Sequence, residues 1–145
     1  IFPLLYVNNF ICLDYPIYQY LLGSQTQSMN IENMIKRRDQ HLKVTKRLIH
    51  FYVEHYSELN EKVQKIIAVR IKYAIYNQYL IYLHMSTKDS KTEIIEFDKW
   101  VKKQNRELYS GPEGKVMRFI KINRRFNYKL FIPFTNLIKK LGMLK

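Results

Sequence analysis

The chain has 145 residues, 47% of them hydrophobic, with only four glycines and four prolines. This length suits one domain with a hydrophobic core, and the low glycine and proline content argues against a loop-rich sandwich and a disordered tail. The net charge of +13 indicates a polyanionic partner: nucleic acid, an anionic lipid surface or a diphosphate-bearing substrate. The one cysteine excludes an internal disulfide framework and is typical of a reducing compartment.

The first 27 residues are predicted to be extended, and they contain one acidic and no basic residue. Residues 15–22, YPIYQYLL, carry aromatic and aliphatic side chains on both faces, which is typical of a covered strand. Gly23 ends this strand. The chain opens without an initiator Met and without the charged region of a secretory signal, so we expect it to begin within a longer protein.

The first predicted helix is long and amphipathic. It begins at Ser28 or Asn30 as N-cap, with Glu32 favourable in its first turn. Apolar residues then recur at spacings of three and four as far as Tyr56.

The second predicted helix, about residues 61–85, is apolar nearly all round and is therefore the expected centre of a bundle. We expect no membrane span here. Arg70 and Lys72 interrupt the apolar run, and a charge near the bilayer centre costs about 2.5–3.5 kcal/mol.

Three further helices complete the prediction. The third covers about residues 91–109 and is closed by Ser110, Gly111 and Pro112; the fourth and fifth cover about residues 113–126 and 129–142. Pro133 limits the first turns of the fifth. The sequence thus predicts a mainly α protein, a bundle of about five helices in residues 28–145 preceded by the short extended segment of residues 1–27.

The last 35 residues concentrate the positive charge, with nine basic residues against one acidic residue. Four phenylalanines alternate with the basic residues: Phe119, Phe126, Phe131 and Phe134. The predicted membrane or polyanion surface consists of Lys115, Arg118, Lys121, Arg124, Arg125, Lys129, Lys139 and Lys140. Such a stretch attracts polyanions: nucleic-acid phosphates, anionic lipid headgroups or a diphosphate-bearing substrate. The alternative is a basic surface that only keeps the domain soluble.

Patterns of catalytic and metal-binding residues are nearly absent. The four histidines have no cysteine or carboxylate at zinc-ligand spacing. Glu96 and Asp98 are two residues apart, so on a helix they point in nearly opposite directions and do not jointly hold a metal ion. No glycine-rich phosphate loop, nucleophile elbow or Cys-x-x-Cys pair occurs. We therefore predict no catalytic residue and no metal site in this chain.

Several short motifs nevertheless follow one another in a familiar order. The first two are Tyr18-Gln19-Tyr20-Leu21-Leu22-Gly23 and Gln27-Ser28, before a helix with Arg37, Arg38, Gln40 and His41. The later ones are Phe97-Asp98, Asn105-Arg106-Glu107-Leu108-Tyr109 and Lys121-Ile122-Asn123-Arg124-Arg125-Phe126. Over roughly residues 13–128 the chain resembles the C-terminal helical region of bacterial family 2 glycosyltransferases. Ser24 and Thr26 stand where the family pattern has Arg and Gly.

The resemblance implies an enzyme whose catalytic part lies outside these 145 residues. An N-terminal GT-A domain would bind a nucleotide-diphospho-sugar and a divalent metal, and residues 1–27 would dock on it. The acceptor would be a cell-surface polysaccharide or a lipid-linked glycan. The implied substrate-binding residues are Tyr18, Tyr20, Gln27, Ser28, Arg37 and His41. The alternative is that the Gln-Ser turn only caps a helix and the tyrosines only pack.

The same resemblance places the protein in the cytoplasm, peripherally on the inner face of the cell membrane. A docking strand without its catalytic domain has an unpaired edge, which would favour a homodimer. A second class of function is a basic helical nucleic-acid-binding or adaptor module, with a steep salt dependence of binding. It is disfavoured because the long first helices do not suit a helix-turn-helix unit. A bundle that only mediates assembly is the third possibility.

Overall fold

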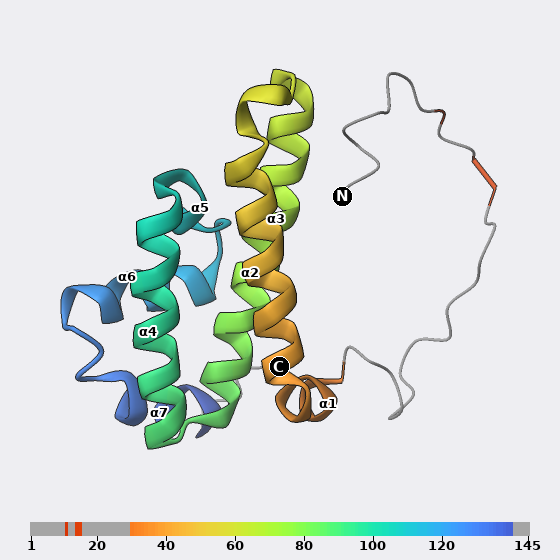
Figure 1. Ribbon diagram of the computed structural model, residues 1–145. Helices are drawn as coiled ribbons and strands as arrows, with labels where there is room; N and C mark the ends of the chain where they lie inside the picture. Colours follow the sequence, from red (N-terminus) through yellow and green to blue (C-terminus); the bar gives the residue numbers. More distant parts are fainter. Residues whose placement is uncertain (1–10, 12–13, 16–29, 141–145) are drawn as a thin grey trace.

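The computed structural model describes Ile11, Asp14, Tyr15 and residues 30–140, which are mainly α-helical and confirm the predicted fold class. The elements in these residues, coloured along the chain in Figure 1, are α1 (Ile31–Lys36), α2 (Arg38–Glu54), the 3₁₀-helix η2 (Tyr56–Glu58), α3 (Glu61–Met85), α4 (Lys88–Gln104), α5 (Arg106–Ser110), α6 (Lys115–Arg125) and α7 (Phe131–Lys140). The predicted strand and its docking edge lie outside the described residues, apart from Tyr15.

The first predicted helix is two helices in the structure. Asn30 is the N-cap, as predicted, and its side-chain oxygen accepts a hydrogen bond from the Glu32 N–H at 2.8 Å. Arg37 ends α1 with φ −104° and ψ 19°. The His41 N–H donates to the Arg37 carbonyl at 3.1 Å, so helical hydrogen bonding resumes at once. Because the break shifts the helical register little, the apolar spacing continues across it and gives no sign of it.

The predicted central helix is confirmed as α3, with the predicted ends. The Asn60 side chain accepts from the Val63 N–H at 3.0 Å, and Ser86 ends the helix in a left-handed conformation with φ 54°. α3 packs against α1, α2, α4, α5 and α6. Its fully buried side chains include Ile67, Ile71, Ile75, Tyr79, Ile81 and Tyr82. None of the helices in the described residues is long and apolar enough to cross a membrane.

The third predicted helix also divides, into α4 and α5. α4 begins earlier than predicted because Thr87 and Ser90 form a capping box. The Ser90 N–H donates to the Thr87 hydroxyl at 3.1 Å, and the Thr87 N–H donates to the Ser90 hydroxyl at 2.9 Å. Asn105 is extended, with φ −158°, and separates the two helices. Ser110 and Gly111 end α5, and Gly111 has φ 66°, so the predicted closing turn is confirmed.

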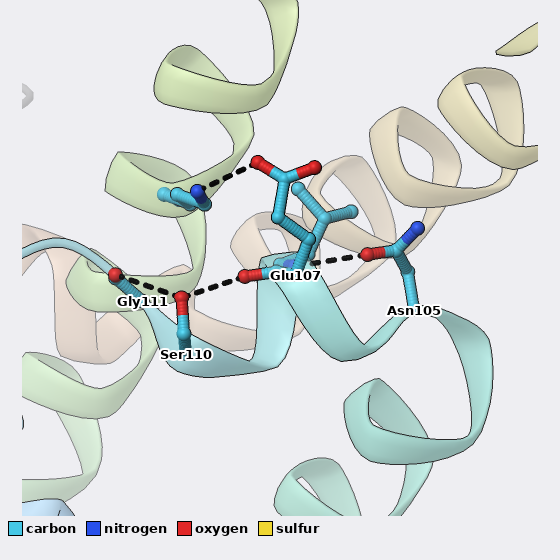
Figure 2. A network of polar contacts seen from close by, with 6 residues as sticks. Asn105, Glu107, Ser110 and Gly111 are labelled. Carbon is cyan, nitrogen blue, oxygen red and sulfur yellow. Dashed lines mark hydrogen bonds and ion pairs between the residues drawn. The ribbon is translucent and has the colours of Figure 1, made fainter. Parts of the chain in front are cut away.

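Asn105 starts α5 as its N-cap (Figure 2). Its side-chain oxygen accepts from the Leu108 N–H at 2.9 Å. At the other end of α5, the Ser110 hydroxyl donates to the Glu107 carbonyl at 2.7 Å (Figure 2). The Lys72 ammonium donates to the Glu107 carboxylate at 2.9 Å and ties α5 to α3. This short helix is therefore fixed at both ends.

The cap predicts a moderate loss of stability for Asn105→Ala. Losing the side-chain acceptor should lower the free energy of unfolding by about 1 kcal/mol. Asn105→Asp is the matched control, because a carboxylate accepts the same N–H and should retain most of the stability. Urea unfolding measures both variants. An equal loss in the Ala and Asp variants would contradict the capping role.

α6 and α7 correspond to the fourth and fifth predicted helices, and each begins two residues later than predicted. The turn between them includes Asn127 and Tyr128 at φ 47° and 56°. Pro133 lies in the first turn of α7, as predicted. The Lys139 ammonium donates to the carbonyl of His84 at 2.5 Å, which ties α7 to the C-terminal end of α3.

Candidate functional site

A buried ionic network centred on Asp98 joins four helices. Asp98 lies on α4 beside Phe97, and both are buried. Its Oδ1 accepts from the Tyr79 hydroxyl on α3 at 2.6 Å, and its Oδ2 accepts from the Tyr109 hydroxyl on α5 at 3.1 Å. Arg124 on α6 donates to the same Oδ1 through Nε at 2.9 Å, and its Nη2 lies 2.8 Å from it. We call Tyr79, Asp98, Tyr109 and Arg124 the Asp98 network.

Aromatic contacts complete the environment of Arg124. Its guanidinium carbon lies 3.6 Å from the centre of the Tyr109 ring, at cation–π distance. Its Nη2 also donates to the Tyr79 hydroxyl at 3.2 Å. Phe97 packs edge-on against Tyr79, with the ring centres 5.4 Å apart. The guanidinium is therefore bound on its edge by oxygens and on its face by an aromatic ring.

Burial determines the electrostatics of the network. The Asp98 and Arg124 side chains are only 8% and 13% exposed. Burial, followed by the negative charge of Asp98, raises the pKa of Tyr79 well above 10 and that of Tyr109 to about 12. Burial alone would lower the pKa of Arg124, but Tyr79 and Asp98 outweigh it and raise that pKa. At neutral pH both tyrosines therefore stay donors and Arg124 stays charged, an arrangement suited to positioning helices.

Two surface hollows adjoin α4. A notch of about 120 Å³ next to the Asp98 network is lined by Lys99, Lys102 and Tyr128 among others. A larger groove of about 320 Å³ lies between α2 and α4, with Trp100, Tyr82 and three carboxylates in its lining. The volume of the groove is at the lower end of the range for small-molecule sites, and the volume of the notch is below that range.

Comparisons with protein-family models, with curated proteins and with solved structures found no match to this chain. Within the described residues, no group of three or more His, Cys, Asp or Glu side chains is placed to hold a metal ion. The geometry of the site is therefore the basis for a proposed function.

Four of the six predicted substrate-binding residues, Tyr18, Tyr20, Gln27 and Ser28, lie outside the described residues. Arg37 is exposed at the junction of α1 and α2, and His41 lies half-buried one turn later. Their backbones are joined by the 3.1 Å hydrogen bond noted above. The structure thus brings these two residues together at the start of α2, but not to the Asp98 network.

The predicted basic surface needs one correction. Arg124 does not belong to it, because its guanidinium is bound to the buried Asp98. Lys139 is exposed, and its ammonium donates one hydrogen bond to the His84 carbonyl. The other members are exposed side chains: Lys115, Arg118, Lys121, Arg125, Lys129 and Lys140.

The phenylalanines of this stretch divide between core and surface. Phe119 and Phe131 are 9% and 0% exposed, so they belong to the core. Phe126 and Phe134 are 54% and 40% exposed. Three aliphatic residues not singled out in the sequence are also exposed: Ile122, Leu130 and Leu137.

The Asp98 network was not predicted as a site from the sequence. A signal for it exists, because Asp98 falls among Ile94, Phe97 and Val101, which form the apolar face of α4. A carboxylate on a buried face needs a partner. The sequence does not reveal which residue that partner is, since Tyr79 and Arg124 lie 19 and 26 positions away.

Proposed function

We propose that this chain is the C-terminal helical part of a family 2 glycosyltransferase. In this proposal the enzyme transfers sugar from a nucleotide-diphospho-sugar to a polysaccharide or lipid-linked acceptor. The 145 residues of this chain are non-catalytic in this proposal and pack against an N-terminal GT-A domain, which would hold the divalent metal.

The observation that supports the proposal is the position of the motif residues. Asp98 of the Phe-Asp motif accepts a hydrogen bond from Tyr109, the last residue of the Asn-x-x-Leu-Tyr motif. Asn105, the first residue of that motif, caps the helix that carries Tyr109. Arg124, at a variable position of the third motif, contacts both Asp98 and Tyr109. The constant residues of two motifs that are separate in the sequence therefore meet in one network, and the segment of the third motif adds the cation.

Other residues of the same motifs also pack inside the bundle. Leu108 is fully buried, and Asn123 is 1% exposed with its amide nitrogen donating to the Phe119 carbonyl at 3.1 Å. Such residues have a structural reason to occur in a fixed order and spacing. Their role in the proposed enzyme is to hold α3, α4, α5 and α6 in one arrangement.

The proposal predicts that the full-length protein containing this chain transfers sugar, and that the Gln27-Ser28 turn contributes. Replacing both residues by alanine should lower the turnover by about tenfold or more, since lost hydrogen bonds to a charged substrate cost about 1.5–3 kcal/mol. Labelled nucleotide-sugars with a membrane extract as acceptor provide the assay.

Two controls make the outcome specific. Gln25→Ala changes the variable position of the same motif and should retain turnover. Arg37→Ala should lower turnover. Lys43→Ala is its control, because it removes another exposed basic side chain, on α2, and should retain turnover. If the full-length protein transfers no sugar from any nucleotide-sugar, the family proposal is wrong. If it transfers sugar and the turn variants match the controls, the proposed contacts are wrong.

A further inference from the structure

We propose that α6, α7 and the turn between them bind an anionic membrane surface. In this proposal exposed apolar side chains enter the lipid interface while flanking lysines and arginines contact headgroup phosphates. The inference rests on residues of this chain alone and does not depend on glycosyltransferase activity.

An apolar ridge runs along these elements. It consists of Ile122, Phe126, Leu130, Phe134 and Leu137, which are 47%, 54%, 36%, 40% and 50% exposed. The first set is Ile122 and Phe126, four residues apart on α6 and at its C-cap. The second set is Leu130, Phe134 and Leu137, at spacings of four and three on α7 and just before it. Such spacings place each set along one side of a helix. The ring of Phe134 on α7 lies 6.1 Å from the ring of Phe119, a core residue of α6, so the two helices are in contact at this point.

Basic side chains accompany the apolar ridge. Lys115, Arg118, Lys121 and Arg125 recur along α6 at spacings of three and four, and the last three each precede a ridge or core residue by one position. Lys129 lies two residues before α7, and Lys140 is its last residue. Within the part of the chain that the structure describes, none of these six cations has an ion-pair partner. Their charge is therefore available to an anionic surface.

The combination of both kinds of side chain favours a membrane. A surface that only keeps a protein soluble is served by the six cations and gains nothing from five exposed large apolar side chains. Nucleic acid offers phosphates to the cations and stacking to Phe126 and Phe134, but no partner for Ile122, Leu130 and Leu137. An anionic bilayer accepts all of them, because it presents phosphates at its surface and acyl chains beneath.

Vesicle sedimentation with the 145-residue chain tests the inference. Binding should be at least about tenfold stronger to phosphatidylcholine vesicles that contain phosphatidylserine than to pure phosphatidylcholine vesicles, and it should weaken with salt. The charge variant Lys121→Gln with Arg125→Gln, and the apolar variant Phe126→Ser with Leu137→Ser, should each lose most of this binding.

Matched controls lie on other exposed faces of the bundle. Lys43→Gln with Arg106→Gln removes the same charge from α2 and α5, and Ile66→Ser with Val69→Ser removes exposed apolar side chains from α3. Both controls should bind as the unchanged chain does. Circular dichroism and thermal unfolding establish that all variants are folded.

Three results would overturn the inference. The first is equal binding to neutral and anionic vesicles, or binding to neither. The second is loss of binding in the control variants to the same extent. The third is tight binding to short RNA or DNA that the charge variant loses and the apolar variant keeps, which would assign the surface to nucleic acid.

Discussion

Replacing Asp98 by asparagine is expected to lower the free energy of unfolding by about 3–5 kcal/mol. The carboxylate accepts hydrogen bonds from Tyr79, Tyr109 and Arg124 inside the bundle. The substitution keeps the shape of the side chain but removes its charge, so Arg124 is left 13% exposed without a counter-ion. The amide group also presents a donor where the network supplies only donors. Urea unfolding followed by circular dichroism measures the loss.

Two further variants separate the ion pair from a general effect of losing charge. Glu96→Gln removes an exposed carboxylate from the same helix and should change the stability by less than about 0.5 kcal/mol. Asp98→Leu with Arg124→Leu removes both charges together and should be less destabilised than Asp98→Asn, because no buried charge remains unpaired. A loss below about 1 kcal/mol for Asp98→Asn would contradict the buried network.

Alkaline pH is expected to unfold the protein between about pH 10 and pH 12. Burial is the main cause that raises the pKa of Tyr82 from 10.0 to about 12, and burial also raises the pKa of Tyr79. Above pH 10 the unfolded chain therefore releases protons that the folded chain retains. The contribution of Tyr82 is fully present below pH 10 and is lost as the pH rises to 12. This loss amounts to at most about 3 kcal/mol for Tyr82 alone.

The slope of stability against pH identifies the titrating groups. Tyr82→Phe has no phenolic proton to release, so its free energy of unfolding should fall less between pH 9 and pH 12 than that of the unchanged chain. Tyr73→Phe alters a tyrosine of the same helix that is 55% exposed, and it should follow the unchanged chain. Chemical unfolding repeated across this pH range gives the comparison. Parallel curves for the Tyr82 variant and the unchanged chain would exclude Tyr82 as a cause.

The sequence was most informative where one pattern covers a whole element. α3 was predicted with both ends because its apolar run is long and nearly continuous; its N-cap Asn60 was not predicted. The divisions at Arg37 and Asn105 were missed for opposite reasons. Arg37 departs so little from helical geometry that the apolar periodicity continues across it. Asn105 is fully extended, and it caps α5 by accepting a hydrogen bond from the Leu108 N–H.

The candidate sites were less accessible to prediction than the helices. The sequence shows that α6 is basic, but it did not predict which of its basic side chains are exposed. Arg124 points into the bundle, whereas Arg125 is exposed. Adjacent helical residues differ in direction by about 100°, and only the packing of the bundle decides which one is buried. The same ambiguity divided the phenylalanines. Arg37 and His41 could be placed on one helix from the sequence, but their distance from the Gln-Ser turn could not.

The inward direction of Arg124 has a mechanical consequence for the whole bundle. This residue fixes α6 to Asp98 of α4, Tyr79 of α3 and Tyr109 of α5, while its neighbours Ile122 and Arg125 face solvent. A buried ion pair therefore links α6 directly to α4, in addition to the covalent connection through the chain. A macromolecule that binds the outer side of α6 therefore contacts a helix whose inner side is joined directly to α3, α4 and α5.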